Sequence, residues 1–182
     1  MTDDLAWETL AARTAYTCEG FDIVNQDVRL PDGTEAAFDY LAEGESVVIL
    51  PLTPDDDVVV IEEWRQAVER VNRALPAGSI EGEEDPEAAA HRELAEETGY
   101  EADAVEHLTT IEPANGFADA VFHYYVARGC APTAEQDLDD DESIRTDETT
   151  LDELLAAARD GDLRDGRTMI GVLYYELFGR RE

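Results

Sequence analysis

The stretch from Gly78 to Tyr100 reads GSIEGEEDPEAAAHRELAEETGY, and the fold of the chain is best inferred from it. Eight of its residues are Asp or Glu, whereas Arg92 is its single basic residue. Asp85 before Pro86 predicts the start of a helix, and Gly99 predicts its end. Glu93 and Glu97 then lie one helical turn apart, where like charges repel each other by about 0.2–0.5 kcal/mol.

These carboxylates border the apolar stripe of the predicted helix rather than lying opposite to it. Ala90 and Leu94 have the same spacing as Glu93 and Glu97, so the acids should be partly buried beside the sheet. A partly buried carboxylate needs a counter-charge, and one guanidinium cannot neutralise several. Mg2+ takes carboxylate, water and phosphate oxygens as ligands. The pattern therefore predicts metal-dependent chemistry on a phosphate ester or anhydride.

Acidic residues occur throughout this chain, so only their positions, and not their number, can indicate a metal site. The chain carries 45 Asp and Glu against 13 basic residues, all of them arginine, with a net charge of -32. Such a charge destabilises a compact state unless salt screens it, which indicates a halophilic protein that unfolds at low ionic strength. The field should repel nucleic acid, and no basic stripe offsets it.

Length and hydrophobic content predict one ordinary folded domain. The chain has 182 residues, 43% of them hydrophobic, which is enough for a sizeable core. Cys18 and Cys130 are far apart and are expected to be reduced thiols. No leader-like segment or membrane span is evident, so we expect a cytoplasmic protein with no membrane partner.

Strand and helix patterns predict an α/β fold with helices on both faces of a mixed sheet. Thr150 and Glu153 form a capping box that starts a helix. The acidic run over residues 135–143 is interpreted as a solvated loop with no role of its own. The other expected elements are hairpins over residues 22–41 and 46–61, strands over 105–111 and 120–127, and a terminal helix over 167–179.

The opening stretch also resembles a known family signature. That signature is Gly, five residues, Glu, seven residues, then Arg-Glu-apolar-any-Glu-Glu-any-Gly-apolar. It is filled here without a gap by Gly78, Glu84, Arg92, Glu93, Leu94, Glu96, Glu97 and Gly99, with Tyr100 in the last, usually aliphatic, place. The chain thus resembles a Nudix hydrolase. The resemblance implies the Nudix alpha/beta/alpha sandwich. The signature segment from Gly78 to Tyr100, called the box below, would form its loop-helix-loop.

Similarity outside the box points to the ADP-ribose and nucleoside-diphosphate-sugar pyrophosphatases. The segments that carry it are VVVIEEWRQAVERVNRALPAG, IEPANGFADAVFHYYVA and GDLRDGRTMIGVLYY. The resemblance implies a Nudix hydrolase domain over residues 46–182. Residues 1–45 are expected to supply N-terminal strands to a homodimer.

The resemblance also implies roles for the residues that match the signature. Glu93 and Glu97 would bind Mg2+ directly, Glu96 directly or through water, and the Ala77 carbonyl would complete the protein ligands, with Mn2+ as an alternative ion. Arg92 would orient the acids. The ion would hold the diphosphate oxygens and activate water for attack on phosphorus. ADP-ribose would give AMP and ribose 5-phosphate.

One departure from the subfamily concerns the general base. Ala120 stands where relatives carry a glutamate proposed as base or extra metal ligand. Asp119 is our candidate to replace it, and Glu112 or Glu142 from another loop are the alternatives.

A second departure concerns substrate binding, because Glu63 and Trp64 replace the usual Gln-Tyr. Arg65 is a candidate phosphate contact or an ordinary surface arginine. Trp64 and Phe117 are candidates for stacking on the base, as are Trp7 and Phe21.

Two alternatives to ADP-ribose hydrolysis stay open at this stage. One is hydrolysis of another sugar nucleotide or a dinucleotide, and the other is a non-catalytic Nudix-like ligand sensor. The retained box glutamates disfavour the sensor.

Overall fold

The computed structural model describes residues 4–18, 20–139 and 142–180, and its contacts divide the chain into two compact units. The first unit comprises residues 1–45 together with 112–121. The second comprises residues 46–111 and 122–182. The first unit therefore includes the loop 112–121, which our division at residue 45 assigned to the hydrolase domain.

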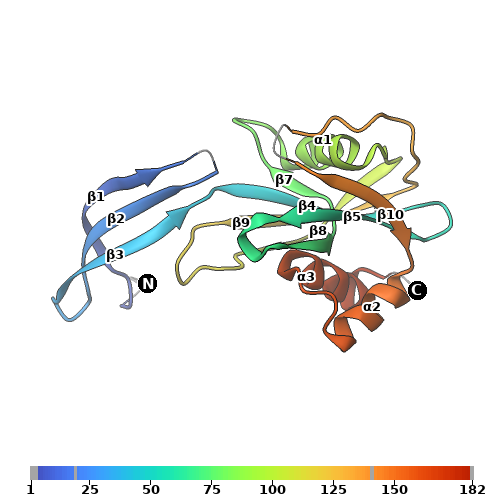
Figure 1. Ribbon diagram of the computed structural model, residues 1–182. Coiled ribbons are helices and arrows are strands. Elements are labelled where there is room, and N and C mark those ends of the chain that lie inside the picture. Colours follow the sequence, from blue (N-terminus) through green and yellow to red (C-terminus); the bar gives the residue numbers. More distant parts are fainter. Residues whose placement is uncertain (1–3, 19, 140–141, 181–182) are drawn as a thin grey trace. The chain divides into compact units, whose positions relative to one another are not determined.

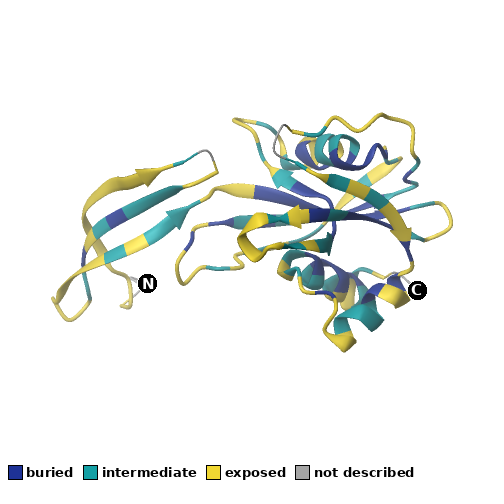
Figure 2. Cartoon of the chain, viewed as in Figure 1, coloured by how far each residue is buried: buried dark blue, intermediate teal, exposed yellow. Residues whose placement is uncertain are grey.

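The first unit is a three-stranded antiparallel sheet in the order β1-β2-β3 (Figure 1). The predicted hairpin joins β2 to β3, and Gly33 takes the positive φ of 87° that its turn requires. All ten residues of β1 are exposed, as Figure 2 shows. The strands are β1 (Glu8–Thr17), β2 (Asp22–Arg29) and β3 (Glu35–Ala42).

The second unit is built on a sheet in the order β10-β5-β4-β9-β8, with β6 paired to β5 and β7 paired to β4. Its strands are β4 (Glu45–Leu52), β5 (Val58–Arg65), β6 (Arg70–Ala74), β7 (Ala77–Ser79), β8 (Ala104–Ile111), β9 (Val121–Arg128) and β10 (Ile144–Thr149), and a short 3-10 turn spans Gln66–Val68. The hairpin and strands expected for this unit are confirmed. The short, polar strands β6, β7 and β10 were not predicted, because they lack an alternating apolar pattern.

Helices cover both faces of this sheet (Figure 1). Helix α1 (Pro86–Thr98) lies on one face, and α2 (Leu151–Asp160) and α3 (Gly166–Tyr174) lie on the other. The last residues, Tyr175–Gly179, continue α3 as a π-helical turn. The predicted α/β/α layers are confirmed, and the central strands β4 and β5 are almost continuously buried (Figure 2).

Side-chain contacts fix the two layers that position the box. On one face, Val47 and Ile49 of β4 pack in one core cluster with Ala90 and Leu94 of α1. On the other face, the fully buried Thr168 of α3 accepts a hydrogen bond of 2.9 Å from the Leu75 N–H through its hydroxyl. The strand segment that leads into the box is thus held between helices.

The cap predicted for α2 is confirmed. The capping box of α2 is present, with hydrogen bonds of 3.2 Å from the Glu153 N–H to Thr150 Oγ1 and 3.3 Å from the Thr150 N–H to Glu153 Oε2. Cys18 and Cys130 are free thiols. Within the described residues, no helix is both long and apolar enough to cross a membrane.

Candidate active site

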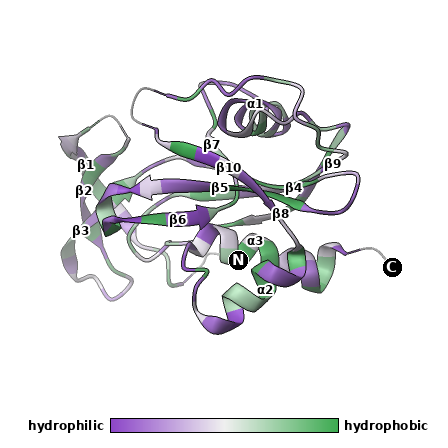
Figure 3. Ribbon diagram, turned by 45° about the vertical axis from the view of Figure 1, so that its right-hand side comes forward, coloured by the Kyte–Doolittle hydropathy of each residue, from purple (hydrophilic) through white to green (hydrophobic). Residues whose placement is uncertain are grey.

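Helix α1 begins and ends where its sequence dictates. The Asp85 carboxylate accepts a hydrogen bond of 3.0 Å from the Glu87 N–H, and Pro86 follows as the first helical residue. Gly99 ends the helix with a φ of 75°. Figure 3 shows hydrophilic and hydrophobic residues together on this helix. Its buried residues are Ala89, Ala90, Leu94, Glu97 and Thr98.

Arg92 gathers the acids of the box around one guanidinium. It donates two hydrogen bonds to the Glu84 carboxylate, at 3.1 and 2.9 Å. Its Nη1 also donates to Glu93 Oε1 at 2.8 Å and to Glu96 Oε2 at 2.9 Å, and its Nη2 donates to the Ser79 carbonyl at 3.0 Å. Three partly exposed carboxylates thus share one guanidinium, and a second cation would balance their remaining negative charge.

Glu97 is the most deeply buried acid of the box. The residue is only 3% exposed, and its Oε2 accepts a hydrogen bond of 2.8 Å from the Ala77 N–H. Burial raises the pKa of Glu97 to about 8, and the charges of Glu93, Glu142 and Glu63 act in the same direction. Burial likewise raises the pKa of Glu93 in spite of Arg92 beside it. Both carboxylates therefore lack sufficient compensating positive charge.

Gly78 is required by close packing against Glu93. A Cβ atom at position 78 would lie 2.1 Å from the Glu93 carboxyl carbon and from its Oε1. The absence of a side chain in β7 therefore makes the space that the carboxylate occupies. This is a physical reason for the first glycine of the signature.

The box acids open onto a cavity of about 340 Å³. Arg92 is the only basic residue among those described that line it. The lining residues are Gly78, Ser79, Glu81, Arg92, Glu93, Glu96, Glu97, Asp137, Leu138, Asp139 and Glu142. The strongly negative lining suits a divalent cation and the phosphates that such an ion carries.

Our interpretation of residues 135–143 as a loop without a role was wrong for the described part of this segment, from which residues 140–141 are excluded. Gln136 donates a hydrogen bond of 2.6 Å to the Glu97 carbonyl, and the Asp137 N–H donates one of 3.0 Å to the Glu96 carbonyl. The Ala134 N–H donates to the Gly99 carbonyl at 3.1 Å. These bonds satisfy carbonyls that the end of a helix leaves unpaired, and they hold the segment beside the cavity. Its many acids resembled the rest of the chain, so only Glu142 drew attention from sequence.

The donor set fits a hard divalent cation, although the acids are engaged with other partners. Among the described residues, no three His, Cys, Asp or Glu side chains are grouped to hold one ion as they stand. Glu93 and Glu96 share Arg92, and Glu97 is turned to the Ala77 N–H. Mg2+ nevertheless prefers carboxylate oxygens, and a bound ion would stabilise the ionised forms of Glu93 and Glu97 that burial disfavours.

The two substrate-contact candidates of β5 leave the strand on opposite faces, because successive side chains of a strand alternate. The Arg65 guanidinium forms an ion pair with the Glu63 carboxylate, with 2.6 Å between Arg65 Nη2 and Glu63 Oε2. Trp64 is 46% exposed and lines a separate cavity with Val71 and Leu138. Leu138 also lines the acidic cavity, so the two cavities share a wall.

Phe117 and Asp119 belong to the first unit. The Asp119 carboxylate accepts a hydrogen bond of 3.0 Å from the Glu43 N–H, and its own N–H donates to the Leu41 carbonyl at 3.1 Å. Phe117 is 64% exposed. The role of Asp119 as general base and that of Phe117 as stacking residue stay predictions.

The α/β/α sandwich, with the acids of α1 beside the glycine of β7, is the arrangement expected of a hydrolase that acts on diphosphates. Residues 43–169 match the family model of the NUDIX domain, and the chain belongs to the Nudix family.

Relatives of known name agree with this assignment. The chain is 30% identical to the ADP-ribose pyrophosphatase of Bacillus subtilis over 171 residues, which cover 93% of this chain and 92% of that protein. It is 36% identical to the methanol dehydrogenase activator of Bacillus methanolicus over 152 residues, covering 83% and 82%. A crystal structure of an ADP compounds hydrolase superposes with a TM-score of 0.83 at 21% identity, covering 94% and 93%. The chain is thus a Nudix pyrophosphohydrolase similar to ADP-ribose pyrophosphatases, as predicted.

Proposed function

We propose that the protein hydrolyses the diphosphate bond of ADP-ribose to AMP and ribose 5-phosphate with Mg2+, for which Mn2+ can substitute. The observation that carries the proposal is the pair formed by the buried Glu97 and the partly buried Glu93, in a cavity where Arg92 is the single arginine among the described lining residues. The similarity to a named ADP-ribose pyrophosphatase along nearly the whole chain supports the choice of substrate.

Glu93, Glu96, Glu97 and the Ala77 carbonyl would hold the ion, after the carboxylates turn from their present partners. When bound, the ion neutralises diphosphate oxygens and makes a bound water more acidic. Arg92 holds Glu84, Glu93 and Glu96 in one arrangement through its hydrogen bonds.

The acidic segment after β9 would supply a general base near the reacting water. Glu142 lines the cavity, and its charge raises the pKa of both Glu93 and Glu97, which places it within electrostatic reach. These facts support Glu142 over Glu112, whose carboxylate accepts a hydrogen bond of 3.4 Å from Asn115 in the first unit. Asp119 remains the other candidate.

Substrate contacts outside the metal site complete the proposal. Arg65 would bind a phosphate oxygen of the substrate with the guanidinium donors that Glu63 leaves free. Trp64 or Phe117 would stack on the base, since both rings are exposed. The exposed strand β1 would pair with a second copy in a homodimer.

Hydrolysis of other sugar nucleotides or dinucleotides is the alternative within the same chemistry. The test is a panel of ADP-ribose, other sugar nucleotides, dinucleotides and nucleoside triphosphates, incubated with Mg2+ or EDTA in high salt, with products identified by mass spectrometry. We expect ADP-ribose to have the highest kcat/KM. No turnover of any substrate would refute the enzymatic proposal.

Variants assign the base in the same assay. Glu142→Gln should lower kcat strongly, and Asp119→Ala should lower it if Asp119 is the base instead. Glu87→Gln, an exposed acid of α1, is the matched control. Full activity in both base variants would exclude both residues from that role.

A further inference from the structure

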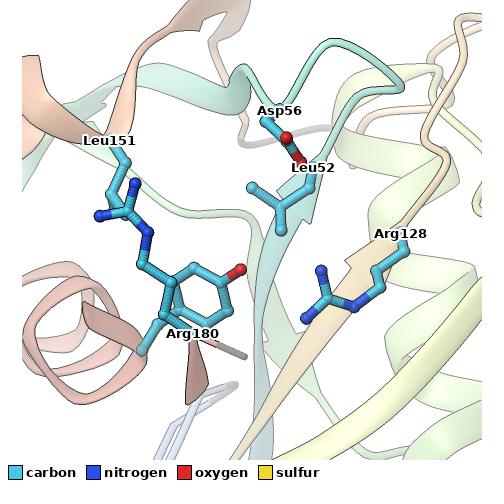
Figure 4. Close-up of a pocket in the computed structure, with 6 residues that line it drawn as sticks. Leu52, Asp56, Arg128, Leu151 and Arg180 are labelled. Carbon is cyan, nitrogen blue, oxygen red and sulfur yellow. The ribbon is translucent and has the colours of Figure 1, made fainter. Parts of the chain in front are cut away.

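A second cavity of about 350 Å³ lies in the second unit, away from the box. Its volume falls within the range of about 300–1,000 Å³ that is usual for small-ligand sites. It is lined by Leu52, Asp56, Arg128, Leu151, Tyr175 and Arg180 (Figure 4). These residues come from the end of β4, the following turn, the end of β9, α2 and the C-terminal π-helical turn.

This cavity is on the face of the sheet opposite to α1. Val47 and Ile49 of β4 pack with α1, so Leu52, five residues after Val47, points to the other face, where it meets Leu151 of α2. The pairing of β4 with β7 ends at Val48, and Leu52 lies about 13 Å further along the strand. The cavity is therefore separate from the acidic one.

Arg128 brings a positive charge to the cavity. Its backbone is fixed by pairing with Ala104, and its guanidinium lies 5.9 Å from the centre of the Tyr175 ring. In a chain with 45 acids, Arg128 forms no ion pair with any carboxylate of the described residues. A half-buried charge without a partner is costly, and a bound anion would offset that cost.

The π-helical turn brings a second arginine to the same cavity. The Arg180 N–H donates a hydrogen bond of 2.9 Å to the Tyr175 carbonyl, which sets Arg180 beside the buried Tyr175. Arg180 pairs with Glu176 through one Nη1 contact of 2.9 Å, so other donors of its guanidinium stay available. Figure 4 shows Arg128 and Arg180 on opposite sides of the cavity. Single π-helical turns occur frequently at functional sites.

We propose that this cavity binds a small phosphate ester of a polyol, such as a sugar phosphate. The phosphate would lie between Arg128 and Arg180, because guanidinium groups bind phosphate oxygens through paired hydrogen bonds. Hydroxyl groups would donate to Asp56, which is held in its turn by a hydrogen bond of 3.0 Å from its N–H to the Thr53 carbonyl. Leu52 and Leu151 would contact the carbon skeleton.

Titration of the full chain with ribose 5-phosphate tests the proposal, in EDTA so that no metal-dependent binding contributes. Affinity is measured by calorimetry, and the arginine Nε–H signals are followed by NMR. Ribose 5-phosphate should bind more tightly than ribose or inorganic phosphate and should shift the Arg128 signal. AMP is titrated in parallel. Tighter binding of ribose 5-phosphate than of AMP supports a free sugar phosphate as the ligand, whereas tighter binding of AMP would identify a nucleotide ligand instead.

Variants make the assignment specific. Arg128→Gln and Arg180→Gln should each weaken binding about tenfold or more, the loss expected for one hydrogen bond to a charged group. Arg164→Gln should bind normally, since Arg164 is exposed and donates to the Gly161 carbonyl instead. Arg180→Gln remains informative should Arg128→Gln unfold. Unchanged affinity in both pocket variants, or no binding of ribose 5-phosphate by the unaltered protein, would overturn the proposal.

Discussion

Glu97→Gln should stabilise the metal-free protein at alkaline pH, although it removes a residue of the site. The folded-state pKa of Glu97 is raised from 4.5 to about 8, mainly by burial. Each pKa unit is worth about 1.4 kcal/mol, so the burial of the ionised form costs at most about 5 kcal/mol. Glutamine keeps the shape and can still accept the hydrogen bond from the Ala77 N–H, but it carries no charge.

The sign of the pH dependence follows from the two states. Between pH 4.5 and about 8 the folded protein keeps the Glu97 proton, whereas the unfolded chain has released it. The unfolded state therefore binds fewer protons, and the free energy of unfolding falls as pH rises through this interval. The advantage of Glu97→Gln should grow from about pH 5 and level off above about pH 8.

Urea unfolding in EDTA and molar KCl, repeated from pH 5 to 9, measures this difference. Glu87→Gln controls for the removal of one negative charge from the same helix. Added Mg2+ should restore the stability of the unaltered protein at pH 8 and leave Glu97→Gln unchanged, because an ion that binds only the folded state stabilises it. Parallel pH profiles for the unaltered protein and Glu97→Gln would refute the reasoning.

Two further predictions follow from single contacts, and a third follows from the net charge. Gly78→Ala should lower turnover about a hundredfold without unfolding the protein, because the new Cβ displaces the Glu93 carboxylate. Gly166→Ala is the control, since a Cβ at that position meets nothing within 4 Å. Equal turnover in the two variants would contradict the packing argument. Thr168→Val should cost about 1–3 kcal/mol in urea unfolding, because the Leu75 N–H loses its buried acceptor. The melting temperature should rise from dilute buffer to molar KCl, given a net charge of -32, and a constant value would argue against charge repulsion.

The sequence predicted those parts of the site that depend on local spacing. The cap at Asp85, the stop at Gly99 and the position of Glu97 beside Leu94 all follow from helical geometry, and the structure has each of them. The contact of Arg92 with Glu84 could also be anticipated, since Arg92 is the only cation near four acids.

Features that depend on distant parts of the chain could not be predicted in this way. Nothing in the spacing of Gln136 and Asp137 indicates that they bond to the carbonyls of Glu97 and Glu96. The pairing of Arg128 with the Tyr175 ring likewise joins residues far apart in sequence. Charge patterning misled us over residues 135–143, because a run of acids in an acidic chain carries little information about position.

Glu93 and Glu97 are proposed to be ligands of an ion that is required for hydrolysis. The most direct measurement is the rate of ADP-ribose hydrolysis as a function of Mg2+ concentration for the unaltered protein, Glu97→Gln and the control Glu87→Gln, with folding checked by circular dichroism. We expect saturable activation of the unaltered protein and the control, and a loss of at least about a hundredfold in Glu97→Gln. Equal Mg2+ activation of folded Glu97→Gln, or undiminished turnover in EDTA, would contradict the account.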